Sequence, residues 1–224
     1  EDGFPIAARV EMLLSSDTSV GVAKSLGLGV IGFADAFDRL RPDILVVLGD
    51  RFEILAAAQA AMIARIPIAH LHGGEATEGL VDEAIRHAVT KMSHLHFVAA
   101  EPYRKRVIQL GERPEHVVTV GAIGLDNLRR LTLLGREELE RALGFSLGRQ
   151  SFLVTYHPVT LSGGSPRGAV QELLGAIDAF PEAQVILTKP NADPGGRAIG
   201  ELIDAYALRR PGRVNGVVAY KQLQ

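Results

Sequence analysis

Two short apolar segments follow one another closely in this chain, and each ends at a group of ionisable residues. Ile44–Leu48 is followed by Gly-Asp-Arg-Phe-Glu, and Ile66–Leu71 is followed by His-Gly-Gly-Glu. Short runs rich in Ile, Leu and Val are typical of buried parallel strands. In open α/β sheets, ligands bind at the carboxyl ends of parallel strands. We therefore expect the polar groups after both strands to form part of one active site.

Strands and helices alternate along most of the chain, and the alternation restarts near its middle. An Ala-rich helix is expected over Glu53–Arg65, and a polar, partly helical bridge over Gly135–Gln150. Alternating strands and helices predict parallel sheets, so the fold class is α/β. We expect two Rossmann-like domains, at residues 1–140 and 148–224. Further strands are expected at 94–99, 116–120, 151–156, 184–187 and 214–219.

The first forty residues carry several glycines inside an amphipathic helix pattern. A dinucleotide-binding fingerprint needs its glycines directly after a strand, and this spacing does not follow one. We therefore interpret these glycines as helix-packing positions.

Composition excludes several classes of protein. The net charge of -2 over 224 residues argues against a nucleic-acid-binding protein. No apolar run approaches the ~20 residues that span a bilayer, so no membrane segment is expected. The absence of cysteine excludes disulfides, thiolate metal sites and a cysteine nucleophile, and it fits a cytoplasmic enzyme.

The residues after the first strand have both functional and structural interpretations. Asp50 could be a carboxylate held at the sheet edge, or it could cap the helix that follows. Arg51 could bind phosphate through its forked guanidinium, or it could form a surface pair with Glu53.

The histidines at the end of the second strand also have functional and structural interpretations. His70 and His72 are not expected to share a metal ion. His72 is the better site candidate because it lies nearest the Gly-Gly turn, and Glu75 directly follows that turn. The helix that follows carries two i, i+4 pairs, which we interpret as surface ion pairs. These pairs are Asp82 with Arg86 and Glu83 with His87.

Two other histidine positions are of interest. His94 and His96 share a face of their strand, but no third ligand is evident, so no metal site is expected. His157 follows the first strand of the second domain. It could contact a phosphate or a leaving group, although a capping or loop histidine is the simpler interpretation.

Five motifs occur in a fixed order and together resemble one enzyme family. They are GDRFE at 49–53, HLHGGE at 70–75, DEAIRHAVTKMSHLHF at 82–97, VGAIGLDN at 120–127 and YHPVT at 156–160. This set resembles the UDP-N-acetylglucosamine 2-epimerases, in particular the hydrolysing branch that serves sialic acid synthesis. The resemblance implies two Rossmann-like domains with a cleft between them, as in GT-B glycosyltransferases. It also implies loss of UDP, a 2-acetamidoglucal intermediate, and release of N-acetylmannosamine.

The resemblance also implies roles for particular residues. Catalytic roles fall to Asp50, Asp82 and either His72 or Glu75, because part of the family has Glu where this chain has His72. Substrate-binding roles fall to Arg51, His87, His157 and Asn191. The implied partner is a UDP-sugar, the implied assembly is a homo-oligomer (a dimer or tetramer), and no metal or other cofactor is implied.

The resemblance leaves alternatives for the substrate and for the class of protein. One alternative enzyme is a UDP-N,N'-diacetylbacillosamine 2-epimerase, which shares the motifs. A non-hydrolysing UDP-N-acetylglucosamine 2-epimerase fits the motifs less well. The candidate from another class is a catalytically inactive regulator that binds a sugar nucleotide. Family members carry ligand-contacting loops that have no counterpart between Glu1 and Gln224. Both domains are therefore expected to be incomplete here, and a protein limited to these residues is expected to be inactive.

Overall fold

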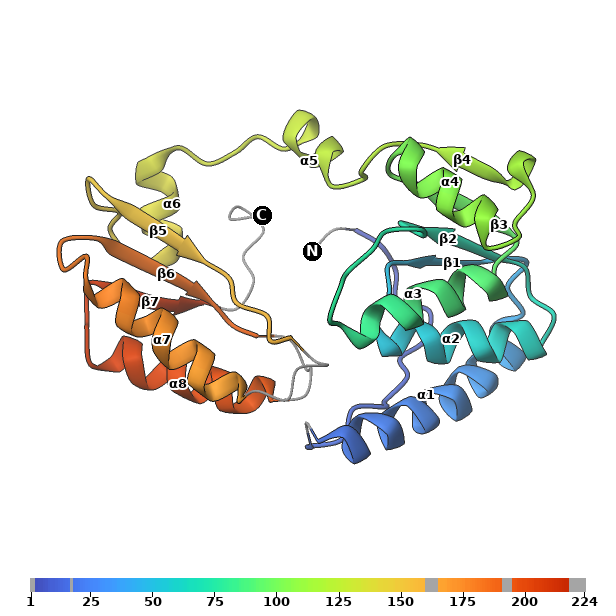
Figure 1. Cartoon of the computed structure of the whole chain (residues 1–224), viewed down its shortest axis with the longest axis horizontal. Helices are drawn as coiled ribbons and strands as arrows, with labels where there is room; N and C mark the ends of the chain where they lie inside the picture. The colour runs from blue at the N-terminus through green and yellow to red at the C-terminus, as the bar shows by residue number, and fades with distance from the viewer. Residues whose placement is uncertain (1–2, 17, 160–164, 191–194, 218–224) are drawn as a thin grey trace. The chain divides into compact units, whose positions relative to one another are not determined.

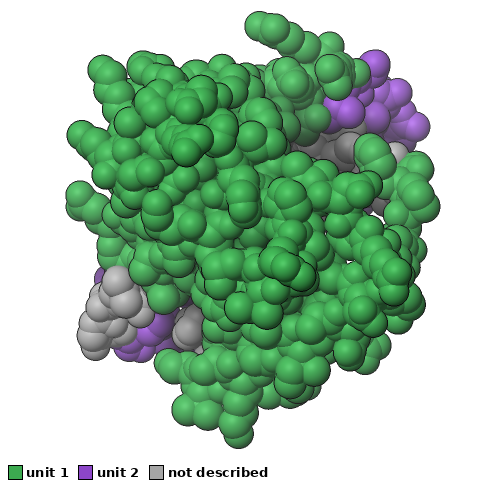
Figure 2. Space-filling view, turned by 90° about the vertical axis from the view of Figure 1, so that its right-hand side faces the viewer, with its two compact units in different colours: residues 1–130 green, residues 131–224 purple. Residues whose placement is uncertain are grey.

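The computed structural model describes residues 3–16, 18–159, 165–190 and 195–217. It contains two compact units, Glu1–Arg130 (unit 1) and Leu131–Gln224 (unit 2). Figure 1 shows the elements of each unit, and Figure 2 distinguishes the units by colour. Each unit has its own parallel sheet, so the α/β class is confirmed.

Unit 1 is built on a four-stranded parallel sheet with strand order β1-β2-β3-β4. The register pairs Val47 of β1 with His70 of β2, and His70 with His96 of β3. Its strands are β1 (Leu45–Leu48), β2 (Ile68–Leu71), β3 (Leu95–Val98) and β4 (Val117–Thr119). Its helices are α1 (Ser19–Leu40), α2 (Phe52–Ile63), α3 (Val81–Met92), α4 (Glu101–Gln109), the 3₁₀ helix η1 (Pro114–His116) and α5 (Leu125–Arg130).

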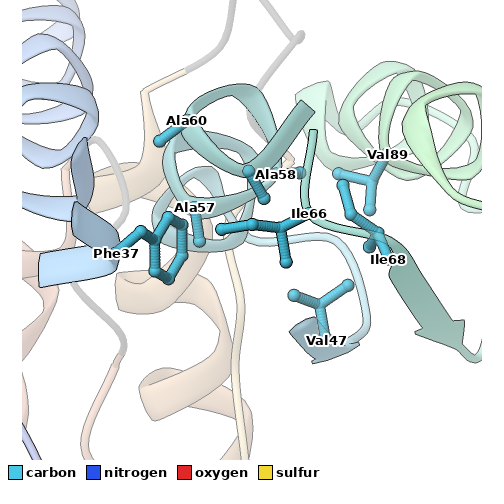
Figure 3. Packing of buried hydrophobic residues seen from close by; sticks show 9 residues of the cluster. Phe37, Val47, Ala57, Ala58, Ala60, Ile66, Ile68 and Val89 are labelled. Atoms are coloured by element: carbon cyan, nitrogen blue, oxygen red, sulfur yellow. The ribbon is translucent and has the colours of Figure 1, made fainter. Parts of the chain in front are cut away.

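The core of unit 1 lies between the Ala-rich α2 and the sheet (Figure 3). Ala58 and Ala61 are fully buried, and so is Ile68 of β2. Small side chains let a helix backbone approach its neighbours closely, and Phe37 and Val89 join this cluster from α1 and α3. This packing holds the start of α2, and with it the Asp50 turn, against the sheet.

Helix α1 begins at the N-cap Thr18, whose hydroxyl accepts a hydrogen bond from the Gly21 backbone N at 3.1 Å. A Cβ added to Gly29 would lie 2.6 Å from Met12 Cε and 2.9 Å from Ala56 Cβ. Gly29 is therefore a packing position, as the sequence predicts, whereas a Cβ added to Gly27 would meet no atom within 4 Å.

By length and composition, α1 is also apolar enough to cross a membrane. The expectation that no apolar segment is long enough to span a bilayer is thus wrong for Ser19–Leu40. This segment consists mostly of apolar and small residues, with a few polar residues between them. In the structure one face of α1 packs against Met12 and Ala56, as in a helix of a globular layer.

Unit 2 has a three-stranded parallel sheet with strand order β5-β6-β7. Two helices pack together against one face of this sheet (Figure 1), and Val185, Leu187 and Ile199 are at the centre of the core. Its strands are β5 (Ser151–Val154), β6 (Gln184–Thr188) and β7 (Val214–Val217), and its helices are α6 (Arg136–Leu143), α7 (Pro166–Asp178) and α8 (Gly196–Leu208). Asn215 Nδ2 donates to the Leu143 carbonyl at 3.4 Å, which ties the bridge helix α6 to unit 2.

Candidate active site

The carboxyl ends of β1 and β2 are joined directly by a hydrogen bond from Gly49 N to the Leu71 carbonyl at 3.0 Å. Gly49 has φ +82°, a conformation that glycine adopts without strain, and it turns the chain toward Asp50. The N-cap of α2 is Arg51, one residue later, so Asp50 does not cap that helix.

Asp50 instead pairs with a buried arginine of α3. Arg86 Nη2 donates to Asp50 Oδ2 and, at 2.9 Å, to Thr77 Oγ1, while Arg86 Nη1 donates to the Glu75 carbonyl at 2.9 Å. The Arg86 side chain is 6% exposed, so its interpretation as a surface residue is wrong. Arg86 links the turns after both strands into one polar cluster.

Arg86 is the functional candidate that sequence reasoning missed. It shares the buried face of α3 with Val89 and Thr90, one helical turn away. An arginine on a face that also carries buried residues was the signal that could have identified it.

His72 and Glu75 form one hydrogen-bonded pair. His72 Nδ1 lies 2.8 Å from Glu75 Oε1, and the Ile123 backbone N donates to His72 Nε2 at 3.4 Å. These partners place the proton on Nδ1 and leave Nε2 as an acceptor. His72 has φ 63°, a left-handed conformation that is uncommon outside glycine and is concentrated at functional sites. The strand therefore ends before His72.

The two glycines between His72 and Glu75 are tightly enclosed. A Cβ on Gly73 would lie 3.0 Å from Thr90 Oγ1, and a Cβ on Gly74 would lie 2.4 Å from the Tyr103 carbonyl oxygen. Arg106 of α4 donates to the Gly74 carbonyl. The loop is thus clamped between α3 and α4, which fixes the position of the His72–Glu75 pair.

His70 supports the Asp50 turn from the buried strand β2. Its Nε2 lies 2.7 Å from the Gly49 carbonyl, to which it donates, and its Nδ1 lies 3.1 Å from Thr90 Oγ1. The side chain is fully buried, and this burial lowers the pKa of His70 from 6.5 to about 4. His70 is therefore neutral at physiological pH.

The lowered pKa of His70 predicts acid-sensitive stability. Below pH 6.5 the unfolded chain binds a proton at this histidine, while the folded chain does not until pH reaches about 4. Folding free energy is therefore lost across this window, by up to about 3 kcal/mol from this group. Urea unfolding from pH 7.5 to 4.5 should show a shallower pH dependence for His70→Gln than for the native protein. The exposed control His116→Gln should keep the pH dependence of the native protein. If His70→Gln also kept the native pH dependence of the unfolding free energy, a lowered pKa of His70 would be contradicted.

The remaining candidates of unit 1 lie around this cluster. Arg51 Nε donates to Glu53 Oε2 at 3.2 Å, which matches the surface-pair interpretation. His87 Nε2 lies 3.8 Å from Glu83 Oε1, so that expected pair is present, and His87 Nδ1 is buried with no hydrogen-bond partner among the described residues. Asp82 is half-buried in the first turn of α3.

The candidates of unit 2 are only partly described. His157 is exposed just after β5, beside the buried Pro158. Asn191 lies outside the described residues. Within the described ranges, no group of three His, Asp or Glu side chains could hold a metal ion. His94 Nδ1 accepts from the Ile68 backbone N at 3.3 Å, and His96 pairs with Glu112.

One large cavity lies away from these strand ends. Its volume is about 1180 Å³, and its lining includes Phe37, Arg41, Ile63, Arg65 and Met92. These residues lie at the carboxyl ends of helices and the amino ends of strands, opposite the Asp50 cluster. The polar cluster, with its convergent hydrogen bonds, is the better candidate for chemistry.

The family model described as UDP-N-acetylglucosamine 2-epimerase matches residues 1–223. The chain belongs to the UDP-N-acetylglucosamine 2-epimerase family. A relative from Campylobacter jejuni, named GDP/UDP-N,N'-diacetylbacillosamine 2-epimerase (hydrolyzing), is 40% identical over 93% of this chain and 54% of its own length. The polysialic acid biosynthesis protein P7 of Escherichia coli is 40% identical over 89% of this chain and 51% of its own length.

A solved 2-epimerase from Methanocaldococcus jannaschii, in complex with UDP-GlcNAc and UDP, superposes with a TM-score of 0.72. Its sequence identity is 20%, over 90% of this chain and 57% of that one, so the likeness concerns the fold. The expected GT-B-like fold class, with two Rossmann-like domains, is thereby confirmed. The chain spans about half the length of the curated relatives it matches.

Proposed function

We propose that this protein is a hydrolysing UDP-sugar 2-epimerase that acts on UDP-N,N'-diacetylbacillosamine. The proposal rests on two hydrogen-bonded pairs of ionisable side chains at one edge of the sheet. The pairs are Asp50 with Arg86 and His72 with Glu75. The hydrolysing relative from Campylobacter jejuni supports the choice of substrate. We further propose that the enzyme is cytoplasmic, uses no metal or other cofactor, and acts as a homo-oligomer.

The proposed reaction has two stages, and each needs a proton transfer. In the first, a base takes the C2 proton, the C2–H electrons form the C1–C2 double bond, and the C1–O bond breaks with its electrons leaving on UDP. In the second, water adds at C1 and a proton returns to C2 from the opposite face. Since the two proton transfers at C2 occur on opposite faces, the reaction needs two acid/base groups.

The two pairs supply those groups. The Nε2 of His72 accepts the C2 proton after it releases its 3.4 Å hydrogen bond from the Ile123 backbone N, and Glu75 stabilises the imidazolium that forms, because it already bonds Nδ1. Asp50, oriented by Arg86, is the group for the opposite face, with Asp82 as a second essential acid. Arg51, His87, His157 and Asn191 bind the nucleotide sugar in this proposal.

UDP-N-acetylglucosamine is the second candidate substrate, because the description of the matched family names it. Release of UDP and free sugar from both nucleotides should be followed by NMR at equal concentrations. The proposal predicts that kcat/KM is higher for the diacetylbacillosamine nucleotide by about tenfold or more, as expected when buried polar contacts are specific to one substrate. Preference for UDP-N-acetylglucosamine would overturn the substrate choice, and no release of UDP from either nucleotide by the full-length protein would overturn the enzyme assignment.

The His72–Glu75 pair has its own test. Glu75→Gln should lower kcat by about 100-fold, the usual size of a lost acid/base contribution, while UDP binding changes little. The matched control is Glu78→Gln, because Glu78 is exposed in the same loop, three residues further on. Equal kcat values for the two variants would remove Glu75 from the mechanism.

A further inference from the structure

Thr90 is a fully buried threonine near the carboxyl end of α3. It lies four residues after Arg86, so both side chains leave the same face of the helix. Val89, next to Thr90, belongs to the same core cluster as Ile68 of β2 (Figure 3). The packing of α3 on this core holds Thr90 close to the strand that carries His70.

The hydrogen bonds of His70 determine the direction of its contact with Thr90. His70 Nε2 lies 2.7 Å from the Gly49 carbonyl oxygen, which can only accept, so Nε2 carries the proton. In the neutral ring, Nδ1 is then an acceptor. Thr90 Oγ1 lies 3.1 Å from Nδ1 and therefore donates its proton to it. A chain of two hydrogen bonds thus runs from Thr90 through His70 to the carbonyl that precedes Asp50.

The Thr90 hydroxyl also lies close to the loop that follows β2. A Cβ added to Gly73 would lie 3.0 Å from Thr90 Oγ1 and 3.1 Å from His70 Nδ1. Because glycine has no Cβ, the loop can pass this close to the hydrogen bond between the two side chains. Thr90 is therefore linked to the turn after β1 through the histidine, and it lies directly against the loop after β2.

Helix α3 holds the Asp50 turn at two points. Arg86 donates to the Asp50 carboxylate, and Thr90, through His70, holds the carbonyl of the preceding residue. The first contact orients the side chain, and the second fixes the backbone from which that side chain starts. Both matter for catalysis, because reacting groups must be held within about 0.5 Å of their productive positions.

We propose that Thr90 is a positioning residue for the reaction. Its hydroxyl, acting through His70, sets where Asp50 lies. Because the same hydroxyl lies against Gly73, it fixes that position relative to the acid/base pair on the second turn. Thr90 does not touch the substrate in this proposal. The inference rests on the proposed function, and the competing interpretation is that Thr90 only fills space in the core.

Two substitutions at position 90 separate the hydroxyl from the shape of the side chain. Thr90→Val keeps the shape and removes the hydroxyl; in the full-length protein it should lower kcat for UDP release about tenfold or more, with KM little changed. Thr90→Ser keeps the hydroxyl and should keep kcat near the native value. The control Thr132→Val, at an exposed threonine, should behave as the native protein does. A native kcat in Thr90→Val, or equal losses in both variants at position 90, would overturn the proposal.

An Asp50→Asn background distinguishes positioning from packing. If Thr90 acts through Asp50, adding Thr90→Val should lower the residual kcat of Asp50→Asn no further, because the group that it positions is already lost. Residual UDP release is measured at high enzyme concentration, and urea unfolding checks that each variant folds. A further tenfold loss in the double variant would show that Thr90 does not act through Asp50.

NMR of the His70 ring tests the hydrogen bond without relying on turnover. Two-bond ¹H–¹⁵N spectra of the native protein should show a protonated Nε2 and an acceptor Nδ1. The Nδ1 resonance should shift in Thr90→Val and return to its native position in Thr90→Ser. An unchanged Nδ1 resonance in Thr90→Val would overturn the role of Thr90 while leaving the proposed function intact. A native full-length protein that releases no UDP would overturn the proposed function, and this role with it.

Discussion

Replacing Arg86 by methionine is expected to remove turnover and to destabilise unit 1. The substitution deletes the hydrogen bonds that join Asp50, the Glu75 carbonyl and Thr77, and it leaves the Asp50 carboxylate without its partner. Breaking a buried ion pair from one side costs about 3 kcal/mol or more, and a misplaced catalytic group costs about 100-fold in kcat. Urea unfolding and UDP release measure the two effects.

Three further variants separate the causes of the lost stability and the lost turnover. Arg86→Lys keeps the charge but loses the forked geometry, so its losses should be intermediate. Arg130→Met, at an exposed arginine of α5, should behave as the native protein does. The double variant Arg86→Met with Asp50→Asn should recover part of the lost stability, because no unpaired charge remains. Native stability in Arg86→Met would show that the arginine does not hold the cluster together.

Replacing Gly74 by alanine is the second substitution with a large expected effect. Gly74 has φ +80°, and its added Cβ would lie 2.4 Å from the Tyr103 carbonyl oxygen and 2.8 Å from Val107 Cγ2. Since both contacts belong to a packed helix, the loop must move, at a cost of about 3 to 5 kcal/mol for strain and overpacking together. The His72–Glu75 pair should be displaced with the loop, and turnover lost.

Gly49 is the matched control for this substitution. It has nearly the same φ, +82°, but a Cβ there would meet no atom within 4 Å. Gly49→Ala should therefore cost only about 1 to 2 kcal/mol, from backbone strain alone. The difference between the two unfolding free energies isolates the clash, and equal values would contradict the close approach to Tyr103.

The sheet edge of unit 1 could be predicted from sequence because two physical signals coincide there. A short Ile, Leu and Val run indicates a buried parallel strand, and the abrupt change to ionisable residues at Asp50 and His72 marks its carboxyl end. Strand adjacency then brings both turns together, as the Gly49–Leu71 hydrogen bond shows.

The partners of these residues could not be predicted in the same way. Helical spacing draws attention to Asp82 as a partner of Arg86, but Asp50, which also pairs with Arg86, lies 36 positions away, and only the tertiary fold brings it near. The choice between His72 and Glu75 also depends on backbone geometry. The left-handed conformation at His72 places the two side chains in contact, and the sequence His-Gly-Gly-Glu does not specify that turn.

In the proposed reaction, the protein removes and replaces the C2 proton of a UDP-sugar while releasing UDP. The most direct test is to run the reaction in D₂O and to follow UDP and the free sugar by NMR. The proposed function predicts a free 2-acetamido sugar with inverted configuration at C2 and deuterium at that carbon, formed in step with UDP. Release of UDP with protium and the original configuration retained at C2 would contradict it, as would a product that remains attached to UDP.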